Sequence, residues 1–261
     1  MIEQAGLSLD IMYKPKDVLS GDFYWFGERK NKVFIAVADC TGHGVPGAML
    51  SISGHSLLNR IVFEEKYTEV DLILNRLHIG LIELLRVEKT DTQDGMDIQL
   101  VSLDKSTGET CYSGASNPLY YTDDKGELHK IVADRLSIGG TKTKMPHNFT
   151  KKIVPETWRN LFLFSDGFQD QFGANGKKFM VGNFKKSLIR NAHLPTKKQI
   201  DLLTNEFREW RGSTVQTDDV LLVSVKKGEK LINNEKVFKR LLLEIEALEE
   251  KKTGLSQGGS K

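Results

Sequence analysis

One segment, residues 38–48, constrains the fold most, because an apolar strand there runs through a glycine-rich turn into a helix: Ala38-Asp39-Cys40-Thr41-Gly42-His43-Gly44-Val45-Pro46-Gly47-Ala48. Val33 to Ala38 predicts a buried strand, and Pro46 has the fixed φ favoured in the first turn of a helix. Helical spacing continues at Ala48, Met49, Ile52 and Leu57. The strand therefore ends in a carboxylate, Asp39, at the mouth of a tight turn.

The glycines of this turn allow two interpretations. Gly42, Gly44 and Gly47 match G-x-G-x-x-G between a strand and a helix, which is the context of a dinucleotide-binding fingerprint. An ionised Asp39 would repel a pyrophosphate at the helix N-terminus but would attract a divalent cation. The fingerprint also requires an acidic residue about 20 positions on, after a second parallel strand, whereas residues 64–65 are predicted to end a helix. A metal site is therefore favoured.

The composition excludes several classes of protein. The chain has 261 residues, 39% of them hydrophobic, which is enough for one domain with a large core. Its net charge of +2 results from 37 basic and 35 acidic residues that are well mixed, so no basic face indicates nucleic-acid binding. Cys40 and Cys111 lack C-x-x-C spacing, which excludes a disulfide framework and a cysteine-rich zinc site. No apolar run reaches the about 18 residues of a membrane span and no secretion signal is present, so we expect a cytoplasmic protein.

Hydrophobic periodicity predicts two pairs of helices. The first pair covers Pro46–Phe63 and Val70–Arg86, and the second covers Asn183–Asn191 and Thr196–Trp210. Runs rich in β-forming residues predict strands at Met96–Leu103, Glu109–Ala115, Leu119–Thr122, Leu128–Val132, Phe149–Val154, Leu161–Phe164 and Val220–Val225. The turns between these runs indicate largely antiparallel sheets.

This order of elements predicts two stacked sheets flanked by helices, which is a layered α/β arrangement. The first predicted helix also carries a face of small residues, formed by Gly47, Ser51 and Gly54. Such a face predicts that the helix backbone packs closely against another element.

Four acidic positions stand at the ends of apolar strands. Besides Asp39, Asp22 precedes the aromatic run Phe23-Tyr24-Trp25, Asp166 follows Leu161–Phe164, and the pair Asp218-Asp219 precedes Val220–Val223. Each position alone fits ordinary turn chemistry or a solvated loop. Together, with no cluster of histidine or cysteine, they favour an oxygen-ligand site for Mg²⁺ or Mn²⁺.

The motifs resemble those of the metal-dependent protein phosphatases (PPM family) of the bacterial type represented by sporulation stage II protein E. The resemblance covers residues 8–227 and is carried by Ser20-Gly21-Asp22-Phe23-Tyr24, residues 38–48, Asp94-Gly95-Met96-Asp97, Tyr112-Ser113-Gly114-Ala115, Ser165-Asp166-Gly167 and Asp218-Asp219. It implies an α-β-β-α sandwich of two largely antiparallel sheets, with metals in a cleft at one edge of the sheets.

The resemblance also implies a ligand set. Asp39 would bridge two metals, with the Cys40 backbone carbonyl, rather than its thiol, as a ligand of one. Asp166 and Asp218 would hold the second metal, and Asp22 would join directly or through water. Asp219 would take the place of Asp218 if the alignment to the family motif were shifted by one residue. The eukaryotic branch has its histidine two positions after the bridging aspartate, whereas His43 lies four after Asp39, so no general-acid role is carried over to it.

The implied activity is hydrolysis of phosphoserine or phosphothreonine in a protein, by a water activated between two Mn²⁺ or Mg²⁺ ions. Asp39, Asp166 and Asp218 would be the catalytic residues. No covalent intermediate is needed, and Ser165 and Cys40 have no identifiable histidine base. Two alternatives are a catalytically silent phosphatase-fold scaffold that binds a regulatory protein, and a metal-dependent nuclease or phosphodiesterase. The missing basic groove argues against the latter.

The resemblance further implies substrates of bacterial partner-switching pathways, such as an anti-sigma-factor antagonist, and a regulatory switch formed by the helices within Pro46–Arg86.

Residues 1–228 are predicted to form the phosphatase domain, 229–252 an amphipathic helix and 253–261 a disordered tail. The apolar positions of the helix are Phe238, Leu241, Ile245 and Leu248. It would dock on its own domain, form a homodimer or bind a regulatory partner. Both a free-standing phosphatase and a piece of a longer sensor protein fit this organisation.

Overall fold

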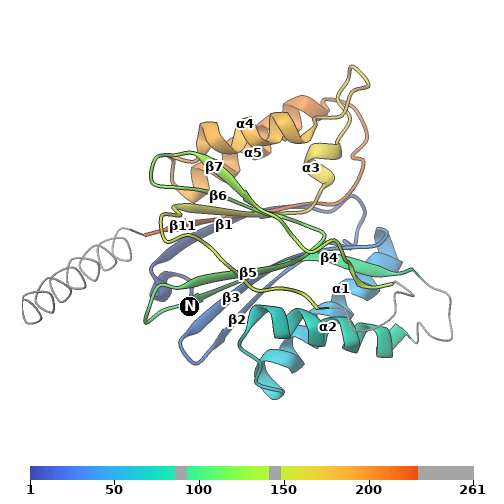
Figure 1. The fold of residues 1–261 in the computed structure, drawn as a ribbon. Coiled ribbons are helices and arrows are strands. Elements are labelled where there is room, and N and C mark those ends of the chain that lie inside the picture. Colours follow the sequence, from blue (N-terminus) through green and yellow to red (C-terminus); the bar gives the residue numbers. More distant parts are fainter. Residues whose placement is uncertain (86–92, 141–147, 229–261) are drawn as a thin grey trace, which may run out of the picture.

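The computed structural model describes residues 1–85, 93–140 and 148–228. Two sheets stack face to face, and each is covered on its outer side by helices (Figure 1). All strand pairs in the two sheets are antiparallel. The expected α-β-β-α sandwich is therefore confirmed, and the antiparallel sheets lack the parallel strand-helix-strand units of a dinucleotide-binding fold.

The first sheet has five strands in the order β1-β11-β10-β6-β7. Their bounds are β1 Leu7–Lys14, β11 Val220–Lys227, β10 Asn160–Phe164, β6 Leu119–Thr122 and β7 Leu128–Ile131. Its outer face is covered by α4 (Val181–Asn191) and α5 (Thr196–Arg211), with the short α3 (Gly167–Asp170) beside them (Figure 1). β1 is a strand that the periodicity did not predict, although it pairs with β11 over its whole length.

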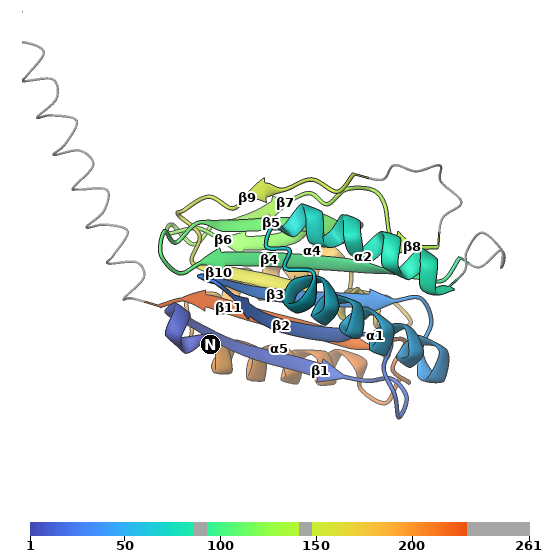
Figure 2. The same ribbon diagram turned by 90° about the horizontal axis from the view of Figure 1, so that it is seen from below.

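The second sheet has the order β2-β3-β4-β5-β9, with β8 paired to β4. Its strands are β2 Phe23–Arg29, β3 Lys32–Cys40, β4 Gly95–Asp104, β5 Thr110–Ala115, β8 Ile138–Gly139 and β9 Lys152–Ile153. The helices α1 (Gly44–Asn59) and α2 (Val70–Leu85) lie side by side over it (Figure 2). A π-helical turn, η2 (Arg60–Glu64), follows α1, and a 3₁₀ turn, η1 (Glu3–Ala5), precedes β1. Of the strand predicted at Phe149–Val154, only β9 forms.

Alternation along β3 decides which residues enter which layer of the core. Val33, Ile35 and Val37 belong to the cluster between the two sheets. Phe34, Ala36 and Ala38 belong to the cluster beneath α1 and α2, together with Cys40. Because side chains alternate along a strand, Asp39 continues the face between the sheets, at the edge of the sandwich.

The small-residue face of α1 allows the predicted close packing. A Cβ on Gly47 would lie 2.3 Å from the Gly42 carbonyl oxygen and 3.0 Å from Cα of Gly21. A Cβ on Gly54 would lie 2.8 Å from Cε of Met96 and 2.9 Å from Cζ of Phe23. The 2.3 Å distance at Gly47 is to backbone and is shorter than real Cβ contacts, so α1 approaches the turn at Gly42 as closely as only glycine permits. The neighbours of Gly54 are side chains.

The predicted amphipathic helix at 229–252 and the tail at 253–261 lie outside the described residues, and so does Arg86. Their structure stays a prediction. Within the described ranges, the helices are all too short or too polar to cross a membrane.

Candidate metal centre

The acidic residues predicted from the sequence come together at one edge of the sandwich. Asp39 ends β3, Asp22 directly precedes β2 beside it, Asp166 directly follows β10 in the other sheet, and Asp218 comes just before β11. Burial raises the pKa of Asp22 and of Asp39; the charges of Asp39 and Asp218 raise that of Asp22 further, and the charges of Asp166 and Asp218 raise that of Asp39. Asp39 and Asp218 therefore lie near Asp22, and Asp166 and Asp218 lie near Asp39, although Asp22 and Asp218 are 196 positions apart (218 − 22).

Asp22 is the most enclosed member of this group. Only 3% of the residue is exposed, and its Oδ2 atom has no hydrogen-bond partner among the described residues. Burial, followed by the charge of Asp39, raises the pKa of Asp22 far above its ordinary value. A buried oxygen without a partner is costly, and a cation would remove that cost.

Asp39 and Asp166 share a cavity of about 320 Å³, which is also lined by Thr41, Asp97 and Ser137. The Asp166 N–H lies 3.5 Å from Oδ2 of Asp39, at the long limit of a hydrogen bond. Burial and the neighbouring carboxylates raise the pKa of Asp39. Partial burial and the charges of Asp170 and Asp218 raise the pKa of Asp166 to about 6, and solvent screens this effect because the residue is exposed at the rim.

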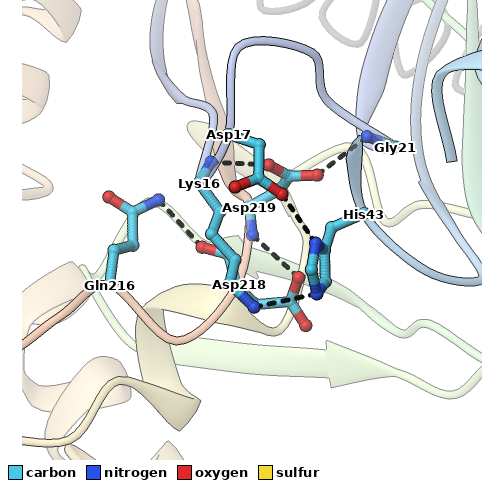
Figure 3. A network of polar contacts seen from close by, with 7 residues as sticks. All are labelled: Lys16, Asp17, Gly21, His43, Gln216, Asp218 and Asp219. Atoms are coloured by element: carbon cyan, nitrogen blue, oxygen red, sulfur yellow. Dashed lines mark hydrogen bonds and ion pairs between the residues drawn. The ribbon is translucent and has the colours of Figure 1, made fainter. Parts of the chain in front are cut away.

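Asp218 and Asp219, adjacent in sequence, have different partners. Asp219 is 3% exposed, and its two carboxylate oxygens accept the backbone N–H groups of Lys16 and Gly21, both at 2.7 Å (Figure 3). Asp218 is exposed, and within the described part of the chain its carboxylate accepts one N–H, that of Asp219 at 2.8 Å. Because Asp219 is occupied in holding the loop before Asp22, Asp218 is the member of the pair with oxygens open to a cation.

His43 is engaged in a surface network on the other side of this loop. Its Nδ1 lies 2.7 Å from Oδ2 of Asp17, and its Nε2 lies 3.0 Å from Nζ of Lys16 (Figure 3). Since the Lys16 ammonium only donates, it favours the tautomer in which Nδ1 carries the proton and Nε2 accepts. His43 thus links the turn after Cys40 to the loop at residues 16–21. Sequence reasoning did not predict this contact, because neither Lys16 nor Asp17 belongs to a motif.

The side chains of Cys40 and Ser165 both have structural roles: one is packed in the core and the other is hydrogen-bonded. The Cys40 thiol packs beneath α1 and α2, and burial raises its pKa well above the ordinary range, so the thiol is neither a ready nucleophile nor a ready ligand. The Ser165 hydroxyl accepts the Leu221 N–H at 2.9 Å, which ties β10 to β11. The Cys40 carbonyl, rather than its thiol, stays the predicted metal ligand of that residue.

A second group of metal-type ligands lies elsewhere, on the β6–β7 hairpin. Asp123, Glu127 and His129 offer one ligand atom each within 4.8 Å of one another, and among the described residues no three of the predicted aspartates are as tightly grouped. The hairpin itself explains this group. Oδ1 of Asp123 accepts the N–H groups of Lys125 and Glu127, and its Oδ2 pairs with Nε2 of His129 at 2.8 Å.

Glycines set the backbone around the aspartates. A Cβ on Gly167 would lie 1.9 Å from the carbonyl oxygen of Asp219, and one on Gly21 would lie 2.5 Å from that of Gly42. Gly42 itself has φ +80°, in the left-handed region. The chain beside Asp22 and beside Asp166 thus packs directly against the backbone of another segment, which fixes the positions of these carboxylates.

This sandwich of two antiparallel sheets between helix pairs, with carboxylates converging at one edge, defines a phosphatase fold of the PP2C class. Among solved structures, the SiaA-PP2C domain of Pseudomonas aeruginosa is 27% identical, with a TM-score of 0.76 and 87% of each chain covered. The PP2C phosphatase domain of SpoIIE from Bacillus subtilis, solved with a fragment of its regulatory domain, is 18% identical, with a TM-score of 0.64, 84% of this chain and 63% of that chain covered. RsbX, solved in complex with magnesium, is 14% identical, with a TM-score of 0.59, 84% of this chain and 94% of that chain covered.

A search of curated proteins found no match. The family described as stage II sporulation protein E (SpoIIE) matches residues 29–227 of the chain. The protein therefore belongs to the SpoIIE family of PPM phosphatases, as its motifs predicted.

Proposed function

We propose that this protein is a metal-dependent protein serine/threonine phosphatase that hydrolyses phosphoserine or phosphothreonine in a regulatory protein. One observation carries the proposal. Asp22, Asp39, Asp166 and Asp218 are distant in sequence but meet at one edge of the fold, and the most buried of them has an oxygen without a partner. Membership of the SpoIIE family supports the same activity.

The donor set fits hard divalent cations. The groups facing the cleft are carboxylate and carbonyl oxygens, which suit Mn²⁺ or Mg²⁺ better than softer metals. We assign Asp39 to both of two ions, the Cys40 carbonyl to one, Asp166 and Asp218 to the other, and Asp22 to the cluster directly or through water. Bound cations would supply a lowered water pKa and polarisation of the phosphoryl oxygens.

The residues of the chain itself determine access and orientation. Asp166 and Asp218 are exposed among the described residues, which supports access of a phosphorylated side chain on the surface of another protein to these carboxylates. Asp219, directly before β11, accepts the N–H groups of Lys16 and Gly21 and thereby fixes both ends of the loop that leads to Asp22. Ser165 is bonded to β11, which favours direct hydrolysis over transfer to a serine.

We propose a phosphorylated regulator of a bacterial partner-switching pathway, such as an anti-sigma-factor antagonist, as the substrate, and the cytoplasm as the compartment. The predicted C-terminal helix would serve self-association or a regulatory partner. The support for these finer assignments is the family resemblance rather than the geometry of the cleft.

The proposal is tested by stripping the protein with a chelator and restoring Mn²⁺ or Mg²⁺ in an assay with phosphoserine and phosphothreonine peptides and a dinucleotide diester. We expect hydrolysis of the peptides only after metal is restored. Full activity after exhaustive chelation would contradict the mechanism. Cation binding without hydrolysis would favour the silent scaffold, and preference for the diester would favour a phosphodiesterase.

A further inference from the structure

Asp97 lies directly opposite Asp39 in the ladder between β3 and β4. Directly opposite residues of an antiparallel pair project from the same face, with Cβ atoms about 4.5–5.5 Å apart. The neighbours of Asp97 along the strand agree with this orientation, because Val101 and Leu103 belong to the cluster between the sheets whereas Met96, Ile98 and Leu100 belong to the cluster beneath the helices. The Asp97 side chain therefore faces the cleft from the β4 side.

This position places two like charges side by side. The carboxylate of Asp97 lies near enough to those of Asp39 and Asp166 to repel both, and all three line the same cavity. Like charges directly opposite each other in a ladder are destabilising. A cation between the three carboxylates would turn this repulsion into attraction.

Two neighbouring serines orient Asp97. The Ser137 hydroxyl, just before β8, donates to Oδ1 of Asp97 at 2.5 Å and itself lines the cavity. Burial raises the pKa of Asp97, and hydrogen bonds from Ser137 and Ser116 lower it. Both serines are neutral donors, so they orient the carboxylate without neutralising its charge, and orienting partners of this kind are typical of metal ligands. Asp97 differs in this from Asp123, which pairs with His129.

The unpartnered Oδ2 of the buried Asp22 independently indicates a cation on the opposite side of Asp39. Because β3 lies between β2 and β4, Asp39 stands in the middle, with Asp22 on one side and Asp97 on the other. Resting on the proposed function, we infer that Asp97 binds the cation held between Asp39 and Asp166, as a fifth carboxylate of the metal centre positioned by Ser137.

The test is a calorimetric titration of the metal-stripped, full-length protein with Mn²⁺. Asp97→Asn keeps the size of the side chain and its acceptor for Ser137, and we expect it to weaken binding at one site by more than the about 10–100-fold that loss of an orienting partner costs. Ser137→Ala should weaken the same site by a smaller factor. Asp104→Asn is the matched control, because Asp104 ends the same strand but caps a turn through the N–H groups of Ser106 and Thr107; it should bind like the wild type.

Equal Mn²⁺ affinity and stoichiometry in the wild type and Asp97→Asn would overturn this inference and leave the proposed function intact. Failure of the wild type to bind Mn²⁺ would contradict the proposed function as well. Melting curves recorded without metal establish that each variant is folded, and relief of repulsion predicts that metal-free Asp97→Asn melts no lower than the wild type.

Discussion

Two groups of carboxylates in this molecule have opposite environments. On the β6–β7 hairpin, Asp123 accepts two backbone N–H groups and pairs with His129, and these bonds hold its pKa below the ordinary range. At the edge of the sandwich, burial and mutual repulsion raise the pKa values of Asp22, Asp39 and Asp166. The hairpin group, Asp123, Glu127 and His129, is tightly spaced, and Asp123 has hydrogen-bond partners within it. The carboxylates of the edge group, Asp22, Asp39 and Asp166, repel one another unless a cation binds between them. Spacing of ligand atoms alone therefore favours the hairpin group, whereas the lack of partners favours the edge group, which we propose as the metal centre.

The largest expected difference between the two groups of carboxylates is their effect on kcat/KM. Asp39→Asn removes the carboxylate common to both proposed ions, and loss of several kcal/mol of electrostatic stabilisation corresponds to at least about a thousandfold lower kcat/KM for a phosphopeptide. Asp123→Asn, in the satisfied group, should change kcat/KM by less than about twofold. Steady-state kinetics with saturating Mn²⁺ measure both. Comparable losses in the two variants would break the distinction between the groups.

The next contrast concerns the backbone that positions Asp166. Gly167→Ala would drive a Cβ into the carbonyl of Asp219, and overpacking of this kind lowers the free energy of unfolding by about 1–3 kcal/mol. Gly182→Ala is the control, because Gly182 lies in α4 with no atom within 4 Å of a built Cβ, and alanine there should raise stability by up to about 1 kcal/mol. Chemical denaturation measures both values. If Gly167→Ala were as stable as the wild type, the proposed rigidity of this segment would be wrong.

The smallest contrast is the pH dependence of the metal-free protein. Since the edge carboxylates have raised pKa values, the folded state binds more protons than the unfolded state once pH exceeds the ordinary value of 3.8. Stability therefore falls as pH rises from about 4 to each raised pKa, which is about 6 for Asp166, about 7 for Asp39 and about 9 for Asp22, so Asp39 and Asp22 account for the fall above pH 6. Asp123 has the opposite sign, because its contribution is lost as pH falls through its lowered pKa. We expect the Tm of chelator-treated protein to decrease by several degrees between pH 6 and 8, at about 2–4 °C per kcal/mol.

Asp22→Asn separates this effect from other titrations over the same range. The variant should show a flatter decline of Tm with pH than the wild type, because its most strongly shifted carboxyl is gone. Added Mn²⁺ should raise the Tm of the wild type most at pH 8, where the carboxylates are ionised and bind it best. Parallel pH profiles for the two proteins would refute the assignment of this effect to the edge group.

Sequence alone determined the parts of this protein that depend on local periodicity. The strand into Asp39, the helix pairs and most hairpins were predicted because alternation and helical spacing act over a few residues, and the ordered motifs indicated the family. β1 was missed because its place depends on pairing with β11, more than 200 residues away. Its mixed pattern of exposed and buried residues carries no clear period of its own.

Only the tertiary structure shows which partners each aspartate has. Asp218 and Asp219 are indistinguishable in sequence, but Asp219 is satisfied by backbone groups of Lys16 and Gly21, which the fold brings to it. Asp97 belongs to a motif for which the sequence indicated no role, and the β3–β4 register places it opposite Asp39. The physical reason is the same in both cases. A carboxylate's function depends on whether its oxygens have partners, and those partners come from segments that only folding brings together.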